Sequence, residues 1–404
     1  MRRTLITIAV AATATFGLAA AAVPSADATP ALASSAHHAK RVCAAARPGE
    51  ASCLAEELVD TATGARVNPL ASAGSAARPA AISGKTPSDI RSAYGLTSTG
   101  SSGRTVAIVD AYGYPNASRD LAVYRSQFGL SACTTANGCL TVVSQTGSSS
   151  LPAYNLGWSQ EQALDLDAVS ATCPDCKILL VQAKTPSFAN LGAAVKTAAA
   201  HAGVVAISNS YGGGDSADSS YGSYYNHPGV AVTASTGDNG YQGASFPASS
   251  HYVTAVGGTS LTKTTSTRGW SESAWSGSGS GCTTLNVAPA GQTSGVTGCS
   301  GRAIADVSAD ADPNTGLAVY APTSSSASSW AQYGGTSLSS PIVAGVYALS
   351  GRTTGYANTL PYAASGGLND VTSGSNGSCA SYCTAGPGYD GPTGLGTPNG
   401  TSAF

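Results

Sequence analysis

Short apolar runs alternate with longer helix-like stretches through most of the chain after residue 100. The apolar runs are 105–110, 177–182, 204–208, 230–234 and 252–256, and the helix-like stretches include 158–170 and 190–202. Strands that are apolar on both faces and alternate with helices are typical of a parallel sheet covered by helices on both sides. The pattern therefore predicts an α/β fold.

The first 28 residues have the pattern of a signal peptide. Arg2 and Arg3 precede an apolar run over 4–23, and small residues around 26–28 offer a cleavage site. A membrane anchor is the weaker alternative, because no later segment has the ~20 unbroken apolar residues that a span requires. We therefore expect a secreted, extracellular protein with no membrane partner.

Residues 29–85 differ in composition from residues 86–404, since they are rich in Ala, Ser and Pro. This composition indicates a propeptide or, alternatively, a disordered linker. We expect a short propeptide over 29–85 and one large domain over 86–404, with the boundary near Thr86.

Ten cysteines in an exported chain fit an oxidising compartment. They fall into close couples that we expect to be mostly local disulfides: Cys43/Cys53, Cys133/Cys139, Cys173/Cys176, Cys282/Cys299 and Cys379/Cys383. A redox or zinc motif at Cys173/Cys176 is the alternative. It is disfavoured because no second pair or histidine lies at metal-ligand spacing.

Charged residues make up only 10% of the chain, and after residue 85 acidic residues outnumber basic ones by 16 to 11. No basic patch indicates a nucleic-acid partner. Few ion pairs can form, so little stability would be lost when carboxylates become protonated. The composition is thus compatible with an acidic environment.

Ser337 is the strongest candidate nucleophile. It lies in the string Gly-Gly-Thr-Ser-Leu-Ser-Ser-Pro over 334–341, which an apolar run follows. Pro341 suits the first turn of a helix, which would put Ser337 just ahead of a helix N-terminus, where backbone N–H groups favour an oxyanion. The alternative is a serine-rich helix cap.

A serine hydroxyl needs a base, and histidine does not offer one here. After residue 85 the only histidines are His201, His227 and His251, and none stands in the His-Gly-Thr setting of a subtilisin-type triad. Each is expected to be a surface or locally hydrogen-bonded residue.

Glu161 and Asp165 are the candidate base and its partner. Their spacing places both carboxylates on one face of the helix predicted over 158–170. Like charges at this spacing repel unless they share a proton, which raises one pKa and suits a working carboxyl pair. The alternative is a solvated acidic face, which nearby Asp167 favours.

Asp238 lies in a Gly-rich loop directly after the apolar run 230–234. Ligands bind in α/β folds at the carboxyl ends of parallel strands. A protonated Asp238 could donate a hydrogen bond to an oxyanion. The alternative is an ordinary turn aspartate.

These motifs together resemble the sedolisin family of serine-carboxyl peptidases. Glu161-x-x-x-Asp165, Gly237-Asp238 and the string around Ser337 occur in the family's order, within a resemblance that runs from about residue 86 to the C-terminus. The resemblance implies a subtilisin-like α/β fold and a hydrolase acting on proteins or peptides. It assigns Ser337 as nucleophile, Glu161 as base, Asp165 as its orienting partner and Asp238 as oxyanion donor, with an acidic pH optimum.

The resemblance also implies one structural Ca²⁺ near the C-terminus. Its ligands would be the carboxylates of Asp370 and Asp390 with the carbonyls of Val371, Gly386 and Gly388, an all-oxygen set that suits this cation. A Gly-rich loop without metal is the alternative.

The chain departs from the family pattern in two respects: 29–85 is far shorter than the usual folded prodomain, and Asp215 stands in a region where a glutamate is common in the family. Two rival functions also stay open: a subtilisin-type peptidase using Asp110 and His201, and an inactive secreted binding protein on the same scaffold. In each case we expect a monomer.

Overall fold

The structure is a computed structural model that describes residues 36–67, 82–352 and 355–404. The described residues belong to one compact unit, Ala36–Phe404. The predicted signal peptide and parts of the predicted propeptide lie outside the described residues.

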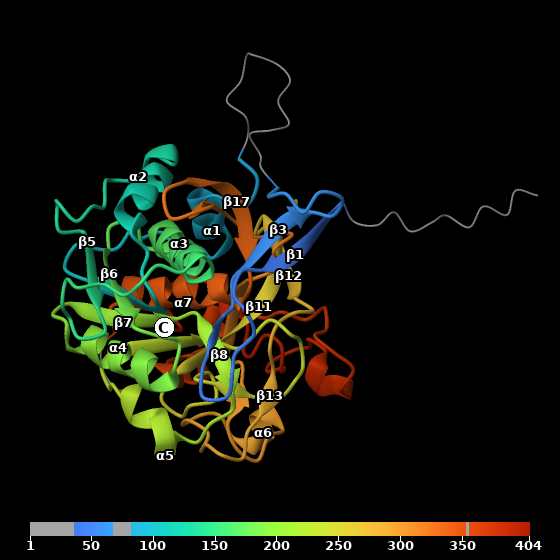
Figure 1. Ribbon diagram of the computed structural model, residues 1–404. Coiled ribbons are helices and arrows are strands. Elements are labelled where there is room, and N and C mark those ends of the chain that lie inside the picture. The colour runs from blue at the N-terminus through green and yellow to red at the C-terminus, as the bar shows by residue number, and fades with distance from the viewer. Residues whose placement is uncertain (1–35, 68–81, 353–354) are drawn as a thin grey trace, which may run out of the picture. The chain divides into compact units, whose positions relative to one another are not determined.

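A mostly parallel eight-stranded sheet forms the centre of this unit (Figure 1). Its order is β12 (Trp270–Ala274), β11 (Thr254–Lys263), β9 (Ala231–Ser235), β7 (Val204–Asn209), β4 (Thr105–Ala111), β6 (Lys177–Ala183) and β5 (Leu140–Ser144), with β15 (Val307–Asp310) also beside β11. Only the β11–β12 pair is antiparallel. The predicted α/β class is confirmed.

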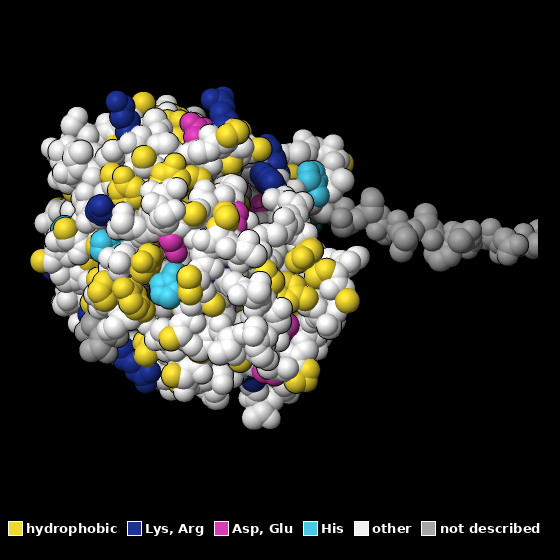
Figure 2. All heavy atoms as spheres, turned by 90° about the horizontal axis from the view of Figure 1, so that it is seen from below, with side chains coloured by type: hydrophobic (Ala, Val, Ile, Leu, Met, Phe, Trp, Pro, Cys, Tyr) yellow, Lys and Arg dark blue, Asp and Glu magenta, His cyan; other side chains and the backbone are white. Residues whose placement is uncertain are grey.

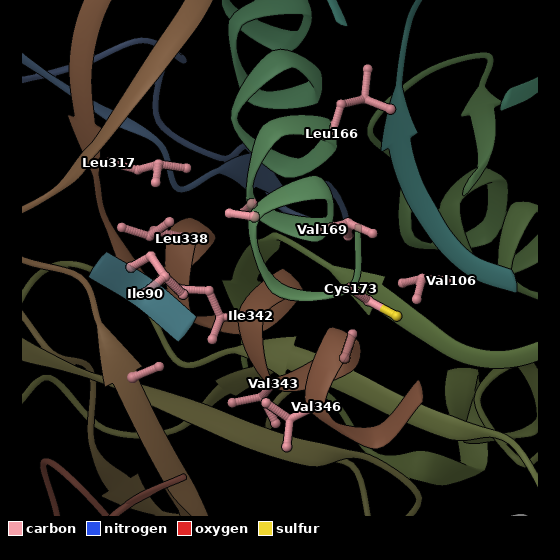
Figure 3. Close-up of a cluster of buried hydrophobic side chains, with 14 of the residues drawn as sticks. Ile90, Val106, Leu166, Val169, Cys173, Leu317, Leu338, Ile342, Val343 and Val346 are labelled. Atoms are coloured by element: carbon pink, nitrogen blue, oxygen red, sulfur yellow. The ribbon is translucent and has the colours of Figure 1, made fainter. Parts of the chain in front are cut away.

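Helices pack on both faces of this sheet. Val106 and Ile108 of β4 join a core with α1 (Pro87–Ala93), α2 (Ala117–Gln127), α3 (Leu156–Thr172) and α7 (Thr336–Ser350). The alternate residues Ala107 and Val109 join a second core with α4 (Phe188–Ala200), as the two-residue period of a strand requires. Figure 3 shows Leu338 and Ile342 of α7 beside Ile90 of α1 within the first core.

Local capping explains where these helices begin. The side chain of Asn155 accepts a hydrogen bond from the backbone N–H of Trp158, and Ser187 caps α4 in the same way. Thr86 starts α1 with a reciprocal capping box to Asp89. The helices predicted over 158–170 and 190–202 are therefore present.

Helix α7 begins earlier than the sequence predicts. Ser337 lies in its first turn, not ahead of it, and Pro341 lies inside the helix. Pro341 has no N–H to donate to the carbonyl of Ser337, four residues earlier. That carbonyl instead accepts a hydrogen bond from the hydroxyl of Ser210 at 3.3 Å. The proline thus releases a backbone group of Ser337 for a contact outside the helix.

Two smaller sheets include residues from the predicted propeptide (Figure 1). One has the order β1 (His37–Arg41), β3 (Glu56–Asp60), β17 (Ser328–Gly334) and β16 (Leu317–Pro322), and the other β10 (Ser245–Phe246), β8 (Tyr211–Gly214) and β2 (Ser52–Cys53). All pairs in both are antiparallel. Residues 36–67 are thus built into the sheets of the large domain.

The remaining elements are short. They are α5 (Asp218–Tyr221), α6 (Ser294–Thr297), α8 (Leu360–Ala363), β13 (Gly281–Cys282), β14 (Ala303–Ile304), β18 (Leu368–Asn369), β19 (Thr397–Pro398) and 3₁₀ turns at Gly222–Tyr224, Ala357–Thr359, Ser365–Gly367 and Ala380–Cys383. All five predicted cysteine couples form disulfides, each local in sequence.

Hydrophobic side chains on the face seen in Figure 2 form small separate groups among polar atoms. Across the ranges that the structure describes, no helix combines the length and the apolar character needed to cross a bilayer.

Candidate active site

The structure brings the four predicted site residues together from three elements. Glu161 and Asp165 lie on α3, Asp238 follows β9, and Ser337 lies in the first turn of α7. Glu161, Asp165 and Ser337 are fully buried, and Asp238 is 7% exposed. Within the cluster, Asp165, Ser337 and Asp238 each influence the pKa of Glu161.

Ser210, just before β8, connects the carboxyl pair with the nucleophile. Its hydroxyl donates to Asp165 Oδ1 at 2.8 Å and approaches the Ser337 carbonyl, while the Ser337 hydroxyl donates to the Ser210 carbonyl at 3.2 Å. The string 207–212 that contains Ser210 is a sequence signal for this region, but it does not show which residues Ser210 contacts. Ser210 fixes the position of Asp165 relative to α7.

Burial dominates the electrostatics of the carboxyl pair. It raises the pKa of Glu161 well above its usual value, and the charge of Asp165 raises it further. Burial likewise raises the pKa of Asp165, against the opposing hydrogen bond from Ser210. Two buried carboxyls one helical turn apart therefore hold at least one proton between them over a wide pH range.

Asp110 is a third carboxyl of this cluster. It is fully buried near the end of β4, and neither of its oxygens has a hydrogen-bond partner in the described part of the chain. Burial, then the charges of Asp165 and Glu161, raise its pKa. The sequence signal for Asp110 is a carboxylate within an otherwise apolar strand. From the sequence, Asp110 was assigned only to the alternative subtilisin-type arrangement with His201.

His201, the other member of that rival, lies far from Asp110. It is exposed and follows α4, and nearby Gly203 accepts a hydrogen bond from Thr105 at the opposite end of β4. A seven-residue strand spans roughly 20 Å. His227 and His251 bond to backbone carbonyls, and in the described ranges no histidine hydrogen-bonds with Ser337. The subtilisin-type arrangement of Asp110 with His201 is thus not formed.

Asp238 is positioned by the start of α7. Its Oδ1 accepts hydrogen bonds from the backbone N–H and the hydroxyl of Thr336, whereas its Oδ2 is buried without a partner in the described residues. Burial, followed by the charge of Glu56, raises the pKa of Asp238 well above its usual value. A protonated Asp238 therefore presents one hydrogen-bond donor next to Ser337.

The contact between Ser337 and Glu161 is loose. The Ser337 hydroxyl is among the groups that lower the pKa of Glu161, yet no hydrogen bond of normal geometry joins them, and Glu161 Oε1 stays unpaired within the described ranges. Such contacts often tighten only when substrate binds. The described state is therefore one in which the base has not yet engaged the nucleophile.

A backbone segment from the predicted propeptide lies against the cluster. The N–H groups of Leu54 and Ala55 both donate to Glu161 Oε2, at 2.9 and 2.7 Å. The same segment and β8 line an open cavity of about 330 Å³ that extends to Asp238. Sequence reasoning missed this contact, because it joins residues more than 100 positions apart.

Two of the predicted calcium ligands, Asp370 and Asp390, accept hydrogen bonds from the same glycine-rich loop. Asp370 Oδ2 accepts from Gly388 N, and Asp390 Oδ2 accepts from Gly386 N. Burial raises the pKa of Asp390 to about 6, with a contribution from Asp370. No group of three or more acidic, His or Cys side chains that could hold a metal occurs in the described residues. A cation here would rest on two carboxylates and backbone carbonyls, a donor set that fits Ca²⁺.

No protein-family model matches the chain. Kumamolisin from Bacillus sp. strain MN-32 is 30% identical over 366 residues, which cover 80% of this chain and 63% of kumamolisin. Sedolisin from Pseudomonas sp. strain 101 is 34% identical over 179 residues, covering 40% of this chain and 30% of that protein. The chain thus spans less than two thirds of these curated relatives.

Two solved peptidase structures share the fold of this chain. A complex of Pseudomonas sedolisin, a serine-carboxyl proteinase, with two molecules of pseudo-iodotyrostatin superposes with a TM-score of 0.66 at 26% identity, covering 79% of this chain and 96% of that one. Sphericase, with a TM-score of 0.50 at 18% identity over 76% of this chain and 96% of its own, shares the fold alone. The predicted subtilisin-like α/β fold is confirmed.

Proposed function

The chain belongs to the sedolisin family, and from this premise we propose that it is a secreted serine-carboxyl peptidase that hydrolyses proteins or peptides. One observation carries the proposal: Ser337 shares a buried site with Glu161 and Asp165, and no histidine replaces them among the described residues. A peptidase that uses carboxyl groups as its base requires this set.

The reaction is acyl transfer. Ser337 Oγ attacks the scissile carbonyl carbon while Glu161 takes the hydroxyl proton. The C–N bond then breaks as Glu161 returns that proton to the leaving amine. Water attacks the ester with Glu161 again as base, and the proton returns to Ser337. Asp165 positions Glu161 throughout.

Asp238 stabilises the tetrahedral oxyanion. Its unpaired Oδ2 supports this role, because a proton there would be aimed at a bound carbonyl oxygen. One such donor contributes on the order of 100- to 1000-fold in rate. The backbone N–H of Ser337 at the start of α7 is the second donor.

We expect an acidic pH optimum. Burial raises the pKa of Asp238, so it carries its proton in acid and loses it as the pH rises. The carboxyl pair can still accept one proton while it shares another. Above the pKa of Asp238 an oxyanion donor is lost, and the rate falls.

The proposal includes export, a monomeric state and no nucleic-acid or membrane partner. It also includes one Ca²⁺ held by Asp370, Asp390 and the carbonyls of Val371, Gly386 and Gly388, where the cation would fix the C-terminal loops. Convergence of two carboxylates on the same glycine-rich loop supports this site.

The test compares pH profiles of protein-substrate hydrolysis for the wild type, Glu161→Gln and Ser337→Ala. Acid activity that both changes abolish is the expected result. Asp175→Asn, at an exposed carboxylate, is the control and should match the wild type. Activity near neutral pH that survives Glu161→Gln would contradict the carboxyl base. An inactive binding protein would fail to react with a phosphonyl probe at Ser337 at any pH.

A further inference from the structure

Residues 52–55 run through the site in the direction of an antiparallel strand. Ser52 pairs with Gly212 and Cys53 with Tyr211 of β8. The N–H of Leu54 continues the ladder toward the Ser210 carbonyl at 3.4 Å, the carbonyl that also accepts the Ser337 hydroxyl. Figure 1 shows this segment alongside β8. The ladder thus ends beside the nucleophile.

The Leu54–Ala55 peptide bond lies at the reactive centre. Its nitrogen, that of Ala55, donates to Glu161 Oε2 at 2.7 Å. Its carbonyl oxygen, that of Leu54, lies close to the backbone of Gly335. A Cβ atom added to Gly335 would be 1.9 Å from this oxygen and 2.9 Å from Asp238 Oδ2. The carbonyl therefore lies next to the unpaired oxygen of Asp238. The Leu54 side chain packs over Gly212.

We propose, on the basis of the proposed peptidase function, that residues 36–67 form an internal inhibitor. Leu54 takes the place of the substrate residue on the acyl side of the scissile bond, and Ala55 that of the leaving residue. Both sides of the bond stay attached to the enzyme, whether or not the bond is cut. The inhibitor thus blocks the site without being a propeptide that departs after one cleavage.

The base is held in an unproductive state by this segment. Glu161 Oε2 accepts two backbone N–H groups, and the Ser337 hydroxyl donates to Ser210 and not to Glu161. An enzyme ready to attack needs the base bonded to the hydroxyl. Attack on the Leu54 carbonyl is therefore slow.

The chain after the Leu54–Ala55 bond makes its own contacts with β17 and with the carbonyls of 321 and 322. Glu56 and Glu57 pair with Gly334 and Tyr333 of β17. Arg66 forms an ion pair with Glu57 and also donates to the carbonyls of 321 and 322. Ala55 is fully buried at the start of this anchored strand. Its amine would stay in place after cleavage.

The chain before the bond is tied to the chain after it. Five residues of β1 pair with β3, from His37 opposite Asp60 to Arg41 opposite Glu56. Arg41 also forms an ion pair with Glu56 at 3.5 Å and donates to the Asp238 carbonyl. The Cys43–Cys53 disulfide closes the loop between β1 and β2. Cutting one peptide bond leaves all of these contacts intact.

Because both sides of the Leu54–Ala55 bond stay in place after cleavage, the cleavage of this bond is reversible. Attack by Ser337 Oγ on the Leu54 carbonyl forms an ester, breaks the bond to Ala55 nitrogen and passes the serine proton through Glu161 to that nitrogen. The amine, held beside the ester, can attack it and restore the peptide bond and the serine hydroxyl. Water competes for the ester only when the amine moves away.

The test uses the full secreted chain and the variant Leu54→Lys, which places a charge where the apolar side chain packs and keeps that charge in acid. We expect the initial rate on a denatured protein substrate at acid pH to rise roughly 10- to 100-fold over the wild type, the effect of losing the contacts of one leucine side chain from a binding site. Leu285→Lys, at an exposed leucine, is the control and should not change the rate. Arg41→Ser is a second variant, should Leu54→Lys fail to be secreted.

Native mass spectrometry of the same samples measures retention. In the wild type we expect residues 36–54 to remain with the rest of the chain, even where denaturing analysis finds a cut after Leu54. Loss of this piece, or a wild-type rate equal to that of both variants, would overturn the inhibitor. Absence of hydrolysis and of phosphonyl labelling in every variant would instead refute the peptidase function.

Discussion

Thr336 holds one oxygen of Asp238 through two hydrogen bonds, at 2.8 Å from the backbone N–H and 2.7 Å from the hydroxyl. The other oxygen, Oδ2, is buried without a partner among the described residues, which leaves it available for the proposed oxyanion role. An asparagine can accept both bonds through Oδ1 and donate from Nδ2 without titrating.

We therefore expect Asp238→Asn to keep more activity than Asp238→Ala and to move the alkaline limb of the pH profile upward. Asp238→Ala should lose on the order of 100- to 1000-fold in kcat. The measurement is kcat against pH for both variants. Equal loss in the two, with no shift of the limb, would remove Asp238 from the oxyanion site.

Stability should be greatest in acid. Among the described residues burial raises the pKa of nine carboxyls, six of them well above the usual value: Asp110, Glu161, Asp165, Asp167, Asp238 and Asp310, with smaller rises at Glu56, Glu57 and Asp390. A raised folded-state pKa means that the folded protein binds more protons than the unfolded chain above the usual pKa of about 4. Stability is then full below that value and falls as the pH rises.

We expect Tm of Ser337→Ala, used to prevent self-digestion, to fall steadily from pH 4 to pH 8. Hydrogen bonds from Thr63 lower the pKa of the exposed Asp60. Asp60 therefore changes the stability with pH in the opposite sense, but only weakly. A Tm that rises over this range would show that these carboxyls are ionised at little cost in the folded state.

Calcium removal should destabilise the chain near neutral pH and matter less in acid. Without a cation, burial raises the pKa of Asp390 to about 6, so below that value protons compete increasingly with Ca²⁺ for one of the two carboxylate ligands. A ligand at 100 times its Kd stabilises by about 2.7 kcal/mol. A chelator should therefore lower Tm at pH 7 but hardly at pH 4. Asp370→Asn should abolish the response, and an unchanged response would place the cation elsewhere.

Arg302 and Asp306 form a fully buried ion pair, with contacts of 2.5 and 2.6 Å. Arg302→Ala leaves Asp306 buried without its charged partner, which costs about 3–5 kcal/mol of unfolding free energy. Urea unfolding measures this. Arg352→Ala, at a more accessible arginine, is the control and should cost little. A similarly small loss for Arg302→Ala would show that this buried ion pair contributes little to stability.

The features that were predicted correctly from the sequence depend on local patterns. The alternation of apolar strands with helices predicts the sheet, and the spacing of Glu161 and Asp165 predicts a shared helix face, because both are properties of adjacent residues. Helix α7 begins earlier than predicted, at Thr336, because Pro341 is tolerated inside the helix where Ser210 satisfies the carbonyl that it leaves open.

Contacts between distant segments could not be predicted in this way. Asp110 joins the carboxyl cluster only because β4 passes next to α3. Leu54 reaches Glu161 only because β2 and β3 bind to β8 and β17 on either side of it. Neither residue carries a motif, and no periodicity reports which sheet edge a short strand will join.

Strand β3 also has a consequence for solubility. In the sheet order β1-β3-β17-β16, it pairs with the C-terminal end of β17, at Tyr333 and Gly334. A chain shortened to begin at residue 86 would leave the backbone groups at that end of β17 without this neighbour. Exposed strand edges of this kind pair with other molecules. Such a shortened chain is expected to self-associate, so residues 56–60 protect the enzyme from its own copies.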